Sequence, residues 1–353
     1  METMRRFRER KTVSKTSSSL LVALFVAAAG IEGVHSYAPH FAPPRPRRPT
    51  HRPASIVDAE VLVPPFRAAN DPADHVLSAG PGGVGPTLSF GGREVNLFGF
   101  RVLAAAVLTC PVWGLALNAY EVVAEAVGRD PNRVHFDGLG KIWSRVFLWM
   151  SDCFPERFGR EHVAQEGRAV LYAANHASWL DIPLLCTSID PVFKFIAKGE
   201  LRKVPCIGKQ LVGGKHILID REDRRSQLRT FKEGVAWLKS GVPLMAFPEG
   251  TRSDDGHLQD FKGGIFSMAV KVGVPVVPVT ITHAHAVMPS NALFPFQSGA
   301  GKLAVHLHPP IDPEGLTEAE LSLKVREAIM SKLPQCQLPH QNKDDSDKKL
   351  TEA

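Results

Sequence analysis

From about Val163 onward, short apolar runs rich in β-branched residues alternate with amphipathic stretches, and this alternation is the strongest constraint on the fold. The predicted strands cover residues 169–174, 194–197, 215–219, 243–247, 274–281 and 302–307, and the predicted helices cover about residues 179–188, 222–240, 261–272 and 317–333. Strands that alternate with helices in this way form a sheet with helices packed on its faces. We therefore predict an α/β fold with a mixed, mostly parallel sheet flanked by helices, and chemistry in the loops beyond the strand ends.

Two prolines interrupt the predicted strand at residues 274–281. Pro275 and Pro278 cannot donate a ladder hydrogen bond, because proline has no backbone N–H. Sheets tolerate such residues in an edge strand or at a strand end. We therefore predict one of these two positions for this segment.

Two apolar segments precede the predicted sheet, and we predict that residues 95–150 form helices that anchor the chain to a membrane. Residues 102–120 carry no charge, and a helix of this length is about 30 Å long, close to the hydrocarbon thickness of a bilayer. Pro111 would kink that helix, which membranes tolerate. Residues 142–150 combine two tryptophans with an arginine, which suits a helix at the headgroup level. A buried core helix is the alternative for the first segment.

The beginning of the chain has the composition of a leader. A basic stretch precedes the apolar residues 20–31, and this order predicts a signal peptide over residues 1–36. Residues 37–90 begin without acidic residues and are rich in arginine and proline, which predicts a transit peptide and linker, and therefore delivery to a plastid. The alternative is a signal anchor that leads to the endoplasmic reticulum membrane. Residues 336–353 are predicted to be a disordered tail.

The net charge of +6 does not indicate a nucleic-acid partner, because the basic residues are concentrated in the leader. Residues 1–57 hold ten basic residues against three acidic ones, a net +7, so the rest of the chain carries −1. We therefore predict no binding to nucleic acid.

The cysteines and paired histidines give no sign of a metal site. The five cysteines are scattered without a C-x-x-C spacing, which argues against a disulfide framework and a zinc site. His283-x-His285 and His306-x-His308 could each place two imidazoles on one strand face, but they have no cysteine or carboxylate at ligand spacing. We predict that the protein binds no metal.

A histidine and an aspartate follow the first predicted strand of the sheet at the spacing H-x-x-x-x-D. His176 lies at the strand end, and Asp181 comes about one and a half helical turns later, so the two side chains can meet. A histidine oriented by a carboxylate can remove a proton from a hydroxyl near neutral pH. We predict that His176 is a general base oriented by Asp181 and that the hydroxyl belongs to the substrate.

Charged residues follow three further predicted strands. Residues 247–253 supply a turn, a carboxylate and a guanidinium in one loop, and Lys198 and Arg221 follow the predicted strands at residues 194–197 and 215–219. Arg252, Arg221 and Lys198 could converge on one phosphate group, because guanidinium and ammonium groups bind phosphate well. This pattern predicts an anionic substrate of the glycerol-phosphate type.

These segments resemble the glycerolipid acyltransferases, and most closely the 1-acylglycerol-3-phosphate acyltransferases. The four family blocks occur in order at residues 175–181, 213–221, 247–253 and 274–279, and the resemblance covers roughly residues 160–290. It implies an acyltransferase domain over residues 151–335. It also implies a thioester of acyl carrier protein or coenzyme A as co-substrate, and no metal or other cofactor.

The resemblance also implies roles for individual residues. His176 would be the base and Asp181 its orienting partner. The residues implied to bind substrate are Lys198, Arg221, Glu249, Gly250, Thr251 and Arg252. The residues that complete the motifs are Asn175, Gly208, Pro248, Pro275 and Pro278.

The predicted reaction is transfer of an acyl chain to the sn-2 hydroxyl of lysophosphatidic acid, which makes phosphatidic acid. Backbone N–H groups near Gly250 are candidates to bind the oxyanion. One alternative is an acyltransferase or transacylase for glycerol-3-phosphate or another lysophospholipid, and a second is a phospholipid-binding protein without catalysis. If the donor is the acidic acyl carrier protein, the predicted docking residues are Arg202, Lys203, Lys209 and Lys215.

Overall fold

The computed structural model describes residues 87–90, 93–127, 130–165, 167–190, 193–292, 295 and 297–340. All of them belong to one compact unit, Pro72–Ala353. The predicted signal peptide and nearly all of the predicted transit peptide and linker lie outside the described residues. Within the predicted linker, the described strand β1 (Thr87–Phe90) pairs antiparallel with β2 (Arg93–Asn96), so regular structure begins earlier than predicted.

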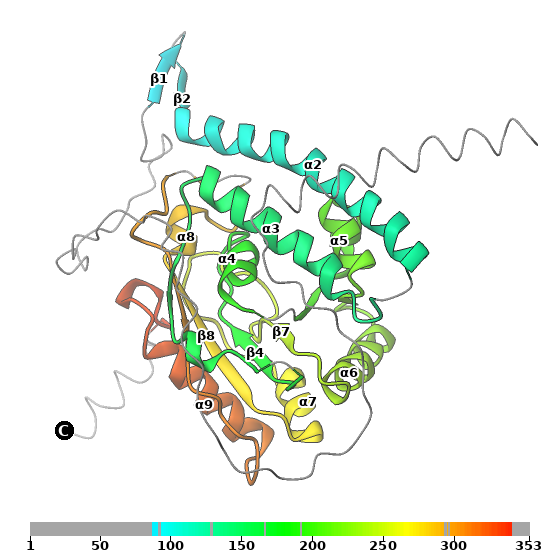
Figure 1. Cartoon of the computed structure of the whole chain (residues 1–353). Helices are drawn as coiled ribbons and strands as arrows, with labels where there is room; N and C mark the ends of the chain where they lie inside the picture. The colour runs from blue at the N-terminus through cyan, green and yellow to red at the C-terminus, as the bar shows by residue number, and fades with distance from the viewer. Residues whose placement is uncertain are drawn as a thin grey trace, which may run out of the picture. The chain divides into compact units, whose positions relative to one another are not determined.

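A seven-stranded sheet forms the centre of the structure, with strand order β3-β9-β8-β4-β7-β5-β6 (Figure 1). Neighbouring strands are parallel except β8 and β9, which are antiparallel. The strands are β3 (Glu156–Phe158), β4 (Leu171–Ala174), β5 (Lys194–Lys198), β6 (Ile217–Ile219), β7 (Leu244–Ala246), β8 (Val276–Thr282) and β9 (Ala304–Leu307). The predicted mixed, mostly parallel sheet is therefore confirmed.

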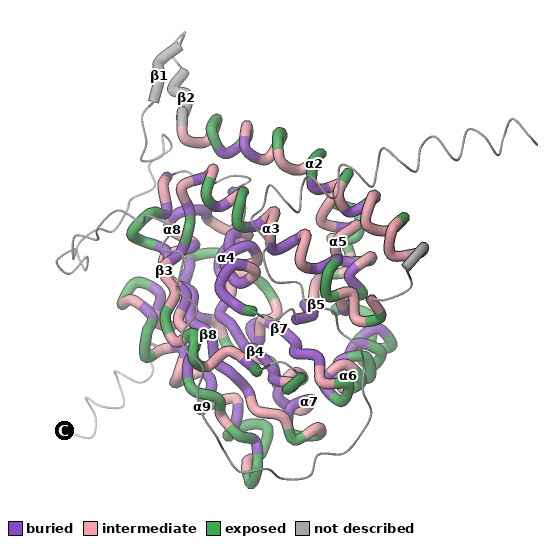
Figure 2. Tube along the Cα trace, viewed as in Figure 1, coloured by how far each residue is buried: buried purple, intermediate pink, exposed green. Residues whose placement is uncertain are grey.

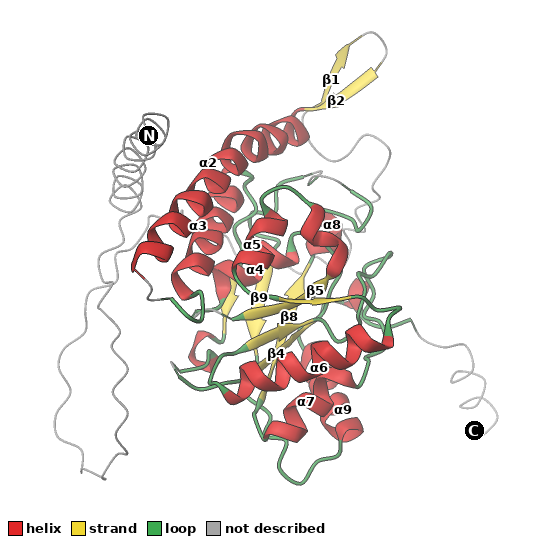
Figure 3. Ribbon diagram, turned by 90° about the vertical axis from the view of Figure 1, so that its right-hand side faces the viewer, coloured by secondary structure: helices red, strands yellow, loops and turns green. Residues whose placement is uncertain are grey.

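Helices cover both faces of the sheet (Figure 3). One layer contains α6 (Arg224–Lys239), α7 (Gly264–Val272) and α9 (Glu318–Met330), and the other contains α4 (Asp181–Ser188), α5 (Ile207–Gly213), α8 (Ala284–Val287) and α3 (Val134–Met150). Strand β4 shows why two layers are needed, because its four residues are all buried. Leu171 and Ala173 join the core beneath the first layer, whereas Tyr172 and Ala174 join the core beneath the second. A strand buried on both faces is typical of parallel sheets.

Most of the predicted elements are present, with ends that differ by a few residues. The short elements β3 and α5 and the 3-10 helices η1 (Arg160–His162), η2 (Gly199–Lys203) and η3 (Gln335–Gln337) were not predicted. The last of these lies largely inside the predicted disordered tail, where the N–H of Leu258 donates to the Gln337 carbonyl at 2.9 Å. Residues 336–340 are therefore packed against the domain, and the remainder of the tail lies outside the described residues.

The prediction for the two strand prolines is wrong for Pro278. Pro275 precedes β8, but Pro278 lies inside it, and β8 is an interior strand between β9 and β4. The carbonyl of Pro278 accepts from the N–H of His308, so its missing N–H faces the β9 side of the sheet. Strand β9 ends at Leu307, and two prolines follow at residues 309 and 310. The backbone N–H that Pro278 lacks would therefore face a point where β9 has already ended. This is why an interior strand tolerates the proline.

The predicted anchor segments form two long helices, α2 (Leu97–Val127) and α3, which pack side by side (Figure 1). The rings of Trp113 and Trp143 stack with centroids 4.4 Å apart, and the Trp143 Nε1–H donates to Thr109 at 3.0 Å. Arg101 Nε donates to the carbonyl of Met150 at 2.7 Å, so the start of α2 lies beside the end of α3. Pro111 lies within α2 without ending it.

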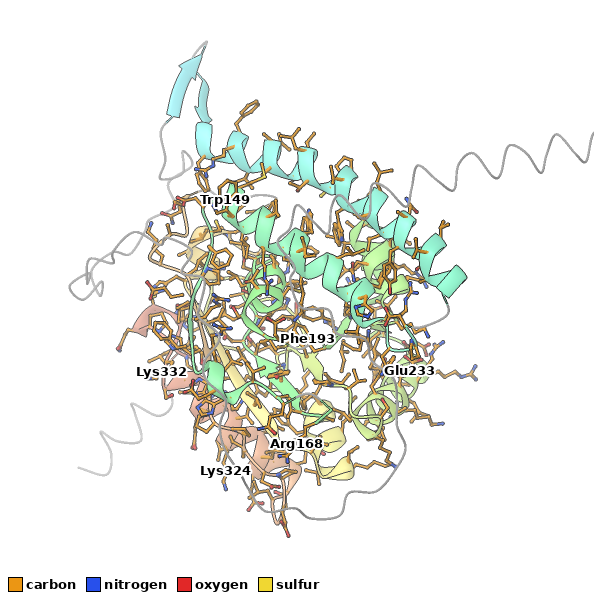
Figure 4. The ribbon with its side chains drawn as sticks, in the orientation of Figure 1. Trp149, Arg168, Phe193, Glu233, Lys324 and Lys332 are labelled. Atoms are coloured by element: carbon orange, nitrogen blue, oxygen red, sulfur yellow. The ribbon has the colours of Figure 1, made fainter. Side chains whose placement is uncertain are left out.

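The face of α2 turned away from the domain is apolar and exposed (Figure 2). Exposed residues recur at helical spacing along it, namely Phe100, Leu103, Val107, Leu108, Val112 and Leu115. On α3, Trp149 is 73% exposed and lies near the start of α2 (Figure 4). Of the described helices, α2 is the one long and apolar enough to cross a membrane. Because one side packs on α3, it is neither a fully buried core helix nor an isolated one.

Candidate active site

The loop between β4 and α4 brings His176 and Asp181 together. His176 Nδ1 lies 2.7 Å from Asp181 Oδ2, and the same oxygen accepts the N–H groups of Ala177 and Ser178 at 2.8 and 2.9 Å. An ionised carboxylate only accepts hydrogen bonds, so the imidazole proton belongs on Nδ1. The side chain of Asp181 is 1% exposed and that of His176 is 13% exposed. His176 Nε2 is therefore left as the basic atom that a substrate hydroxyl can approach.

Three contacts hold this loop in place. The side chain of Asn175 donates to the carbonyl of Ile281 at 2.9 Å and accepts its N–H at 2.8 Å, which ties the loop to β8. The Ser178 hydroxyl donates to the carbonyl of Met288 at 2.7 Å. The imidazole of His176 stacks on Phe247, with ring centroids 3.8 Å apart. The histidine is therefore restrained by a ring on one face and by a carboxylate at one nitrogen.

Glu249 joins the loop after β7 to the loop that carries His176 from inside the protein. It is 3% exposed. Its Oε1 accepts the N–H of His176 at 2.6 Å, and its Oε2 accepts the N–H of Gln259 at 2.9 Å. Burial raises the pKa of Glu249 to about 8, although the two N–H groups favour the charged form. This placement favours a role for Glu249 in positioning the His176 loop over direct contact with a bound substrate.

Arg252 lies close to the histidine–aspartate pair. Its guanidinium is 4.5 Å from the centre of the Trp179 ring, and its Nη1 donates to the carbonyl of Ser290 at 2.5 Å. Partial burial lowers the pKa of Arg252, and the charge of Asp181 acts in the opposite direction. The side chain is held at one corner by Ser290, and it keeps other donors for an anion.

Lys198 and Arg221 lie farther along the same edge of the sheet. Lys198 ends β5 and Arg221 follows β6, and both side chains are exposed. Lys198 Nζ lies 2.8 Å from a carboxylate oxygen of Glu200. Neighbouring strands are about 4.8 Å apart, so the order β4-β7-β5-β6 separates the ends of β4 and β6 by roughly 14 Å. The predicted cations thus lie along a line, and no hydrogen bond joins them among the described residues.

Steric constraints explain why two of the motif positions are glycine. A Cβ on Gly208 would lie 2.1 Å from the carbonyl oxygen of Arg202, so only glycine allows α5 to approach η2 this closely. Gly250 has a φ of 78°, which favours glycine. Its N–H donates to the carbonyl of Phe247 at 3.0 Å and closes a turn. That N–H is therefore unavailable as an oxyanion donor, whereas the N–H groups of Thr251 and Arg252 have no hydrogen-bond partner in the described part of the chain.

The histidine pairs do not form the arrangement that a metal pair on one strand would need. Strand β8 ends at Thr282, so His283 and His285 lie beyond it, and His308 bonds to the Thr280 hydroxyl at 2.8 Å. Within the described residues, one group has ligand atoms close enough to share an ion, namely Asp255, His257 and His340. There, His340 Nε2 lies 2.7 Å from Asp255 Oδ2, a distance that an ordinary hydrogen bond explains.

Known proteins match this chain over the same region. The family model described as Acyltransferase matches residues 157–282. A 1-acyl-sn-glycerol-3-phosphate acyltransferase of Chlamydomonas reinhardtii is 39% identical over 178 residues, which is 50% of this chain and 52% of that protein. The chloroplastic 1-acyl-sn-glycerol-3-phosphate acyltransferase LPAT1 of Arabidopsis thaliana is 31% identical over 232 residues, 64% of either chain. This chain therefore spans about half to two thirds of the length of these relatives.

A solved structure matches as well. The crystal structure of the 1-acyl-sn-glycerophosphate (LPA) acyltransferase PlsC from Thermotoga maritima superimposes with a TM-score of 0.54 at 28% identity. The match covers 66% of this chain and 93% of that one. Residues 157–282 thus match the acyltransferase family model, and the resemblance to the 1-acylglycerol-3-phosphate acyltransferases indicated by the motifs is confirmed.

Proposed function

We propose that this protein transfers an acyl chain from a thioester to the sn-2 hydroxyl of lysophosphatidic acid, which makes phosphatidic acid. The observation that carries the proposal is the His176–Asp181 pair, in which a buried carboxylate oxygen binds the imidazole and two backbone N–H groups. The similarity to proteins named as 1-acyl-sn-glycerol-3-phosphate acyltransferases supports this acceptor.

The proposed mechanism needs no covalent acyl-enzyme. His176 Nε2 removes the proton of the acceptor hydroxyl as its oxygen attacks the thioester carbonyl, and Asp181 stabilises the imidazolium that forms. The tetrahedral intermediate collapses, the carbon–sulfur bond breaks, and the thiolate takes the proton from His176. The products are the new ester and a free thiol, so atoms and charge balance without a metal.

Arg252 is the cation best placed for the acceptor phosphate. It is close enough to Asp181 for that charge to affect its pKa, and it follows β7, the strand next to β4. Lys198 and Arg221 lie one and two strands beyond β7. We expect them to contact parts of the substrates farther from the reacting hydroxyl.

The proposed site works at a membrane surface. The exposed apolar face of α2 and the exposed Trp149 of α3 would insert among lipids. This arrangement suits lysophosphatidate, because that acceptor is itself a lipid. The bilayer would cover the apolar face of α2, which would otherwise be in contact with water. Whether α2 lies in the interface or crosses the bilayer, both arrangements keep the domain against the lipid.

The proposed compartment is a plastid, which the chloroplastic relatives and the composition of the leader support. Acyl carrier protein is the corresponding donor. Two of the four predicted docking residues are already engaged, because Lys209 bonds to Asn118 and Lys215 Nζ lies 3.2 Å from the carbonyl of Pro131. Arg202 and Lys203 on η2 are exposed and remain the docking candidates.

The decisive experiment is an acyl-transfer assay on membranes that contain the full chain. Lysophosphatidate, glycerol-3-phosphate and lysophosphatidylglycerol are each offered with acyl carrier protein and coenzyme A thioesters. We expect phosphatidic acid to form from lysophosphatidate faster than product forms from the other acceptors. A preference for another acceptor would reassign the substrate. Binding of lysophosphatidate without any transfer would instead identify a non-catalytic lipid-binding protein.

A further inference from the structure

A lysine outside all four motifs lies against the loop that carries Arg252. Lys262 follows that loop and precedes α7, and its side chain is exposed. We propose that the Lys262 ammonium binds a phosphate ester of a substrate together with the backbone N–H groups of Thr251 and Arg252. This inference rests on the proposed function and deepens it, because it adds a specificity residue to the same site.

The contact between Lys262 and Gly250 shows where the ammonium lies. A Cβ on Gly250 would be 2.7 Å from Lys262 Nζ, 3.0 Å from its Cδ and 3.1 Å from its Cε. The end of the lysine is therefore folded over the glycine, although the side chain remains exposed to solvent. A side chain at residue 250 would displace the end of Lys262, whereas the positive φ is the reason that glycine is favoured there.

Backbone contacts tie Lys262 to the catalytic loop. Its N–H donates to the carbonyl of Pro248 at 2.9 Å. Three residues earlier, the N–H of Gln259 donates to Glu249, and the other oxygen of Glu249 accepts the N–H of His176. The segment that carries the lysine is thus connected to the proposed base through one buried carboxylate, so the ammonium has a defined place relative to the reaction.

The ammonium itself has no hydrogen bond or ion pair within the described residues. Other lysines near this edge differ, since Lys198 pairs with Glu200, Lys209 with Asn118 and Lys215 with the carbonyl of Pro131. The N–H groups of Thr251 and Arg252, next along the chain from Gly250, are also unpaired in this part of the protein. An ammonium and two consecutive backbone N–H groups suit the oxygens of a phosphate.

Two substrates carry such a group. The acceptor has a phosphomonoester, and both thioester donors have phosphate esters in the arm that leads to the sulfur. We assign Lys262 to the acceptor, because the loop it covers also holds Arg252, which lies near Asp181. A solvated lysine without a ligand is the alternative, and it predicts no effect of substitution.

The test compares Lys262→Ala, Lys262→Arg and Lys271→Ala in the full chain. Lys271 is a matched control, since it is also exposed but lies at the far end of α7, 5.3 Å from the Phe231 ring centre. We expect Lys262→Ala to raise KM for lysophosphatidate by about ten-fold or more, with little change in kcat or in KM for the thioester. Lys262→Arg should recover part of the loss because it retains the charge, and Lys271→Ala should match the wild type.

A binding measurement separates this inference from the proposed function. The affinity of His176→Ala protein for lysophosphatidate and for monoacylglycerol in detergent micelles is measured with and without Lys262→Ala. Loss of affinity for lysophosphatidate alone supports the phosphate contact, even if the wild type transfers no acyl chain. Equal affinities for lysophosphatidate, or equal losses with both lipids, would overturn it. A rise in KM for the thioester alone would move the contact to the donor and refute the acceptor assignment.

Discussion

The loop after β4 and the edge formed by the ends of β5 and β6 lie on the same side of one sheet, yet they are built differently. In the loop, Asp181 is almost fully buried, and its Oδ2 has three hydrogen-bond partners. At the edge, Lys198 and Arg221 are exposed, and Lys198 pairs with the exposed Glu200. The proposed base is therefore held in place by its neighbours, whereas we expect the outer cations to become ordered only when substrate binds. Substitutions should therefore damage chemistry at the first place and binding at the second.

The largest effect is expected at the base. His176→Ala should lower kcat by about two to four orders of magnitude, because it removes the group that accepts the hydroxyl proton. Acyl transfer by the purified variant measures the loss, and circular dichroism checks the fold. His135→Ala, at an exposed position on α3, is the control and should retain activity. If His176→Ala retains more than a tenth of the activity, another residue is the base.

The next effect separates the inner cation from the outer ones. Arg252→Ala should weaken use of lysophosphatidate by about 1.5–3 kcal/mol in kcat/KM, the range for a hydrogen bond to a charged group. Arg221→Ala should lower kcat/KM less, because Arg221 follows β6, which lies two strands away from β7. Arg252→Lys should recover only part of the loss, since lysine lacks the planar fork.

A neutral acceptor provides the control for this comparison. Monoacylglycerol has no phosphate, so the Arg252→Ala loss should be small with it. Equal relative losses with lysophosphatidate and monoacylglycerol would contradict phosphate recognition at Arg252. A larger loss for Arg221→Ala than for Arg252→Ala would reverse the assignment of inner and outer cations.

A smaller effect is expected at the apolar face of α2. Leu108→Glu places a charge on a side chain that is 63% exposed, so the domain should fold normally while its affinity for phosphatidylcholine vesicles falls by about ten-fold. Vesicle sedimentation measures the bound fraction. Leu323→Glu is the matched control, because Leu323 is 57% exposed on α9 and should not touch lipid. Equal binding by both variants would show that α2 does not face the membrane.

The smallest effect concerns the pH dependence of stability. Burial raises the pKa of Glu249 from 4.5 to about 8, so between these values the folded protein holds a proton that the unfolded chain has lost. The free energy of unfolding should therefore fall as pH rises through this window. Melting temperatures of the wild type and Glu249→Gln measured from pH 5 to 8 should show a decline of a few degrees that the variant lacks. Parallel profiles would mean that Glu249 is charged throughout.

Much of the fold and the contact between His176 and Asp181 could be predicted from the sequence because their signals are local. The alternation of apolar runs with amphipathic stretches predicts most of the strands and helices, and the spacing of His176 and Asp181 corresponds to a contact within one loop. Short elements such as β3 and α5 have too few residues for a periodic pattern. Their ends are decided by neighbours that the local sequence does not reveal.

The structure changed the interpretation of individual residues wherever a distant partner decides the outcome. Pro278 is accepted inside the sheet because β9 ends beside it, which no property of the β8 sequence indicates. Glu249 belongs to a conspicuous motif, but burial between His176 and Gln259 favours a positioning role over direct contact with an acceptor. Lys262 has no motif spacing that would have identified it, and its position over Gly250 became visible only in three dimensions.

The sequence by itself determined the type of fold, the contact between His176 and Asp181, and the apolar stripe of α2, since periodicity and short spacings are properties of consecutive residues. The tertiary structure alone decided which strands are neighbours. Strand order therefore decided that Arg252 follows the strand next to the one that leads to His176, while Lys198 and Arg221 are spread along the edge. Strand pairing depends on contacts between residues far apart in the chain, which leave no regular pattern in the order of the amino acids.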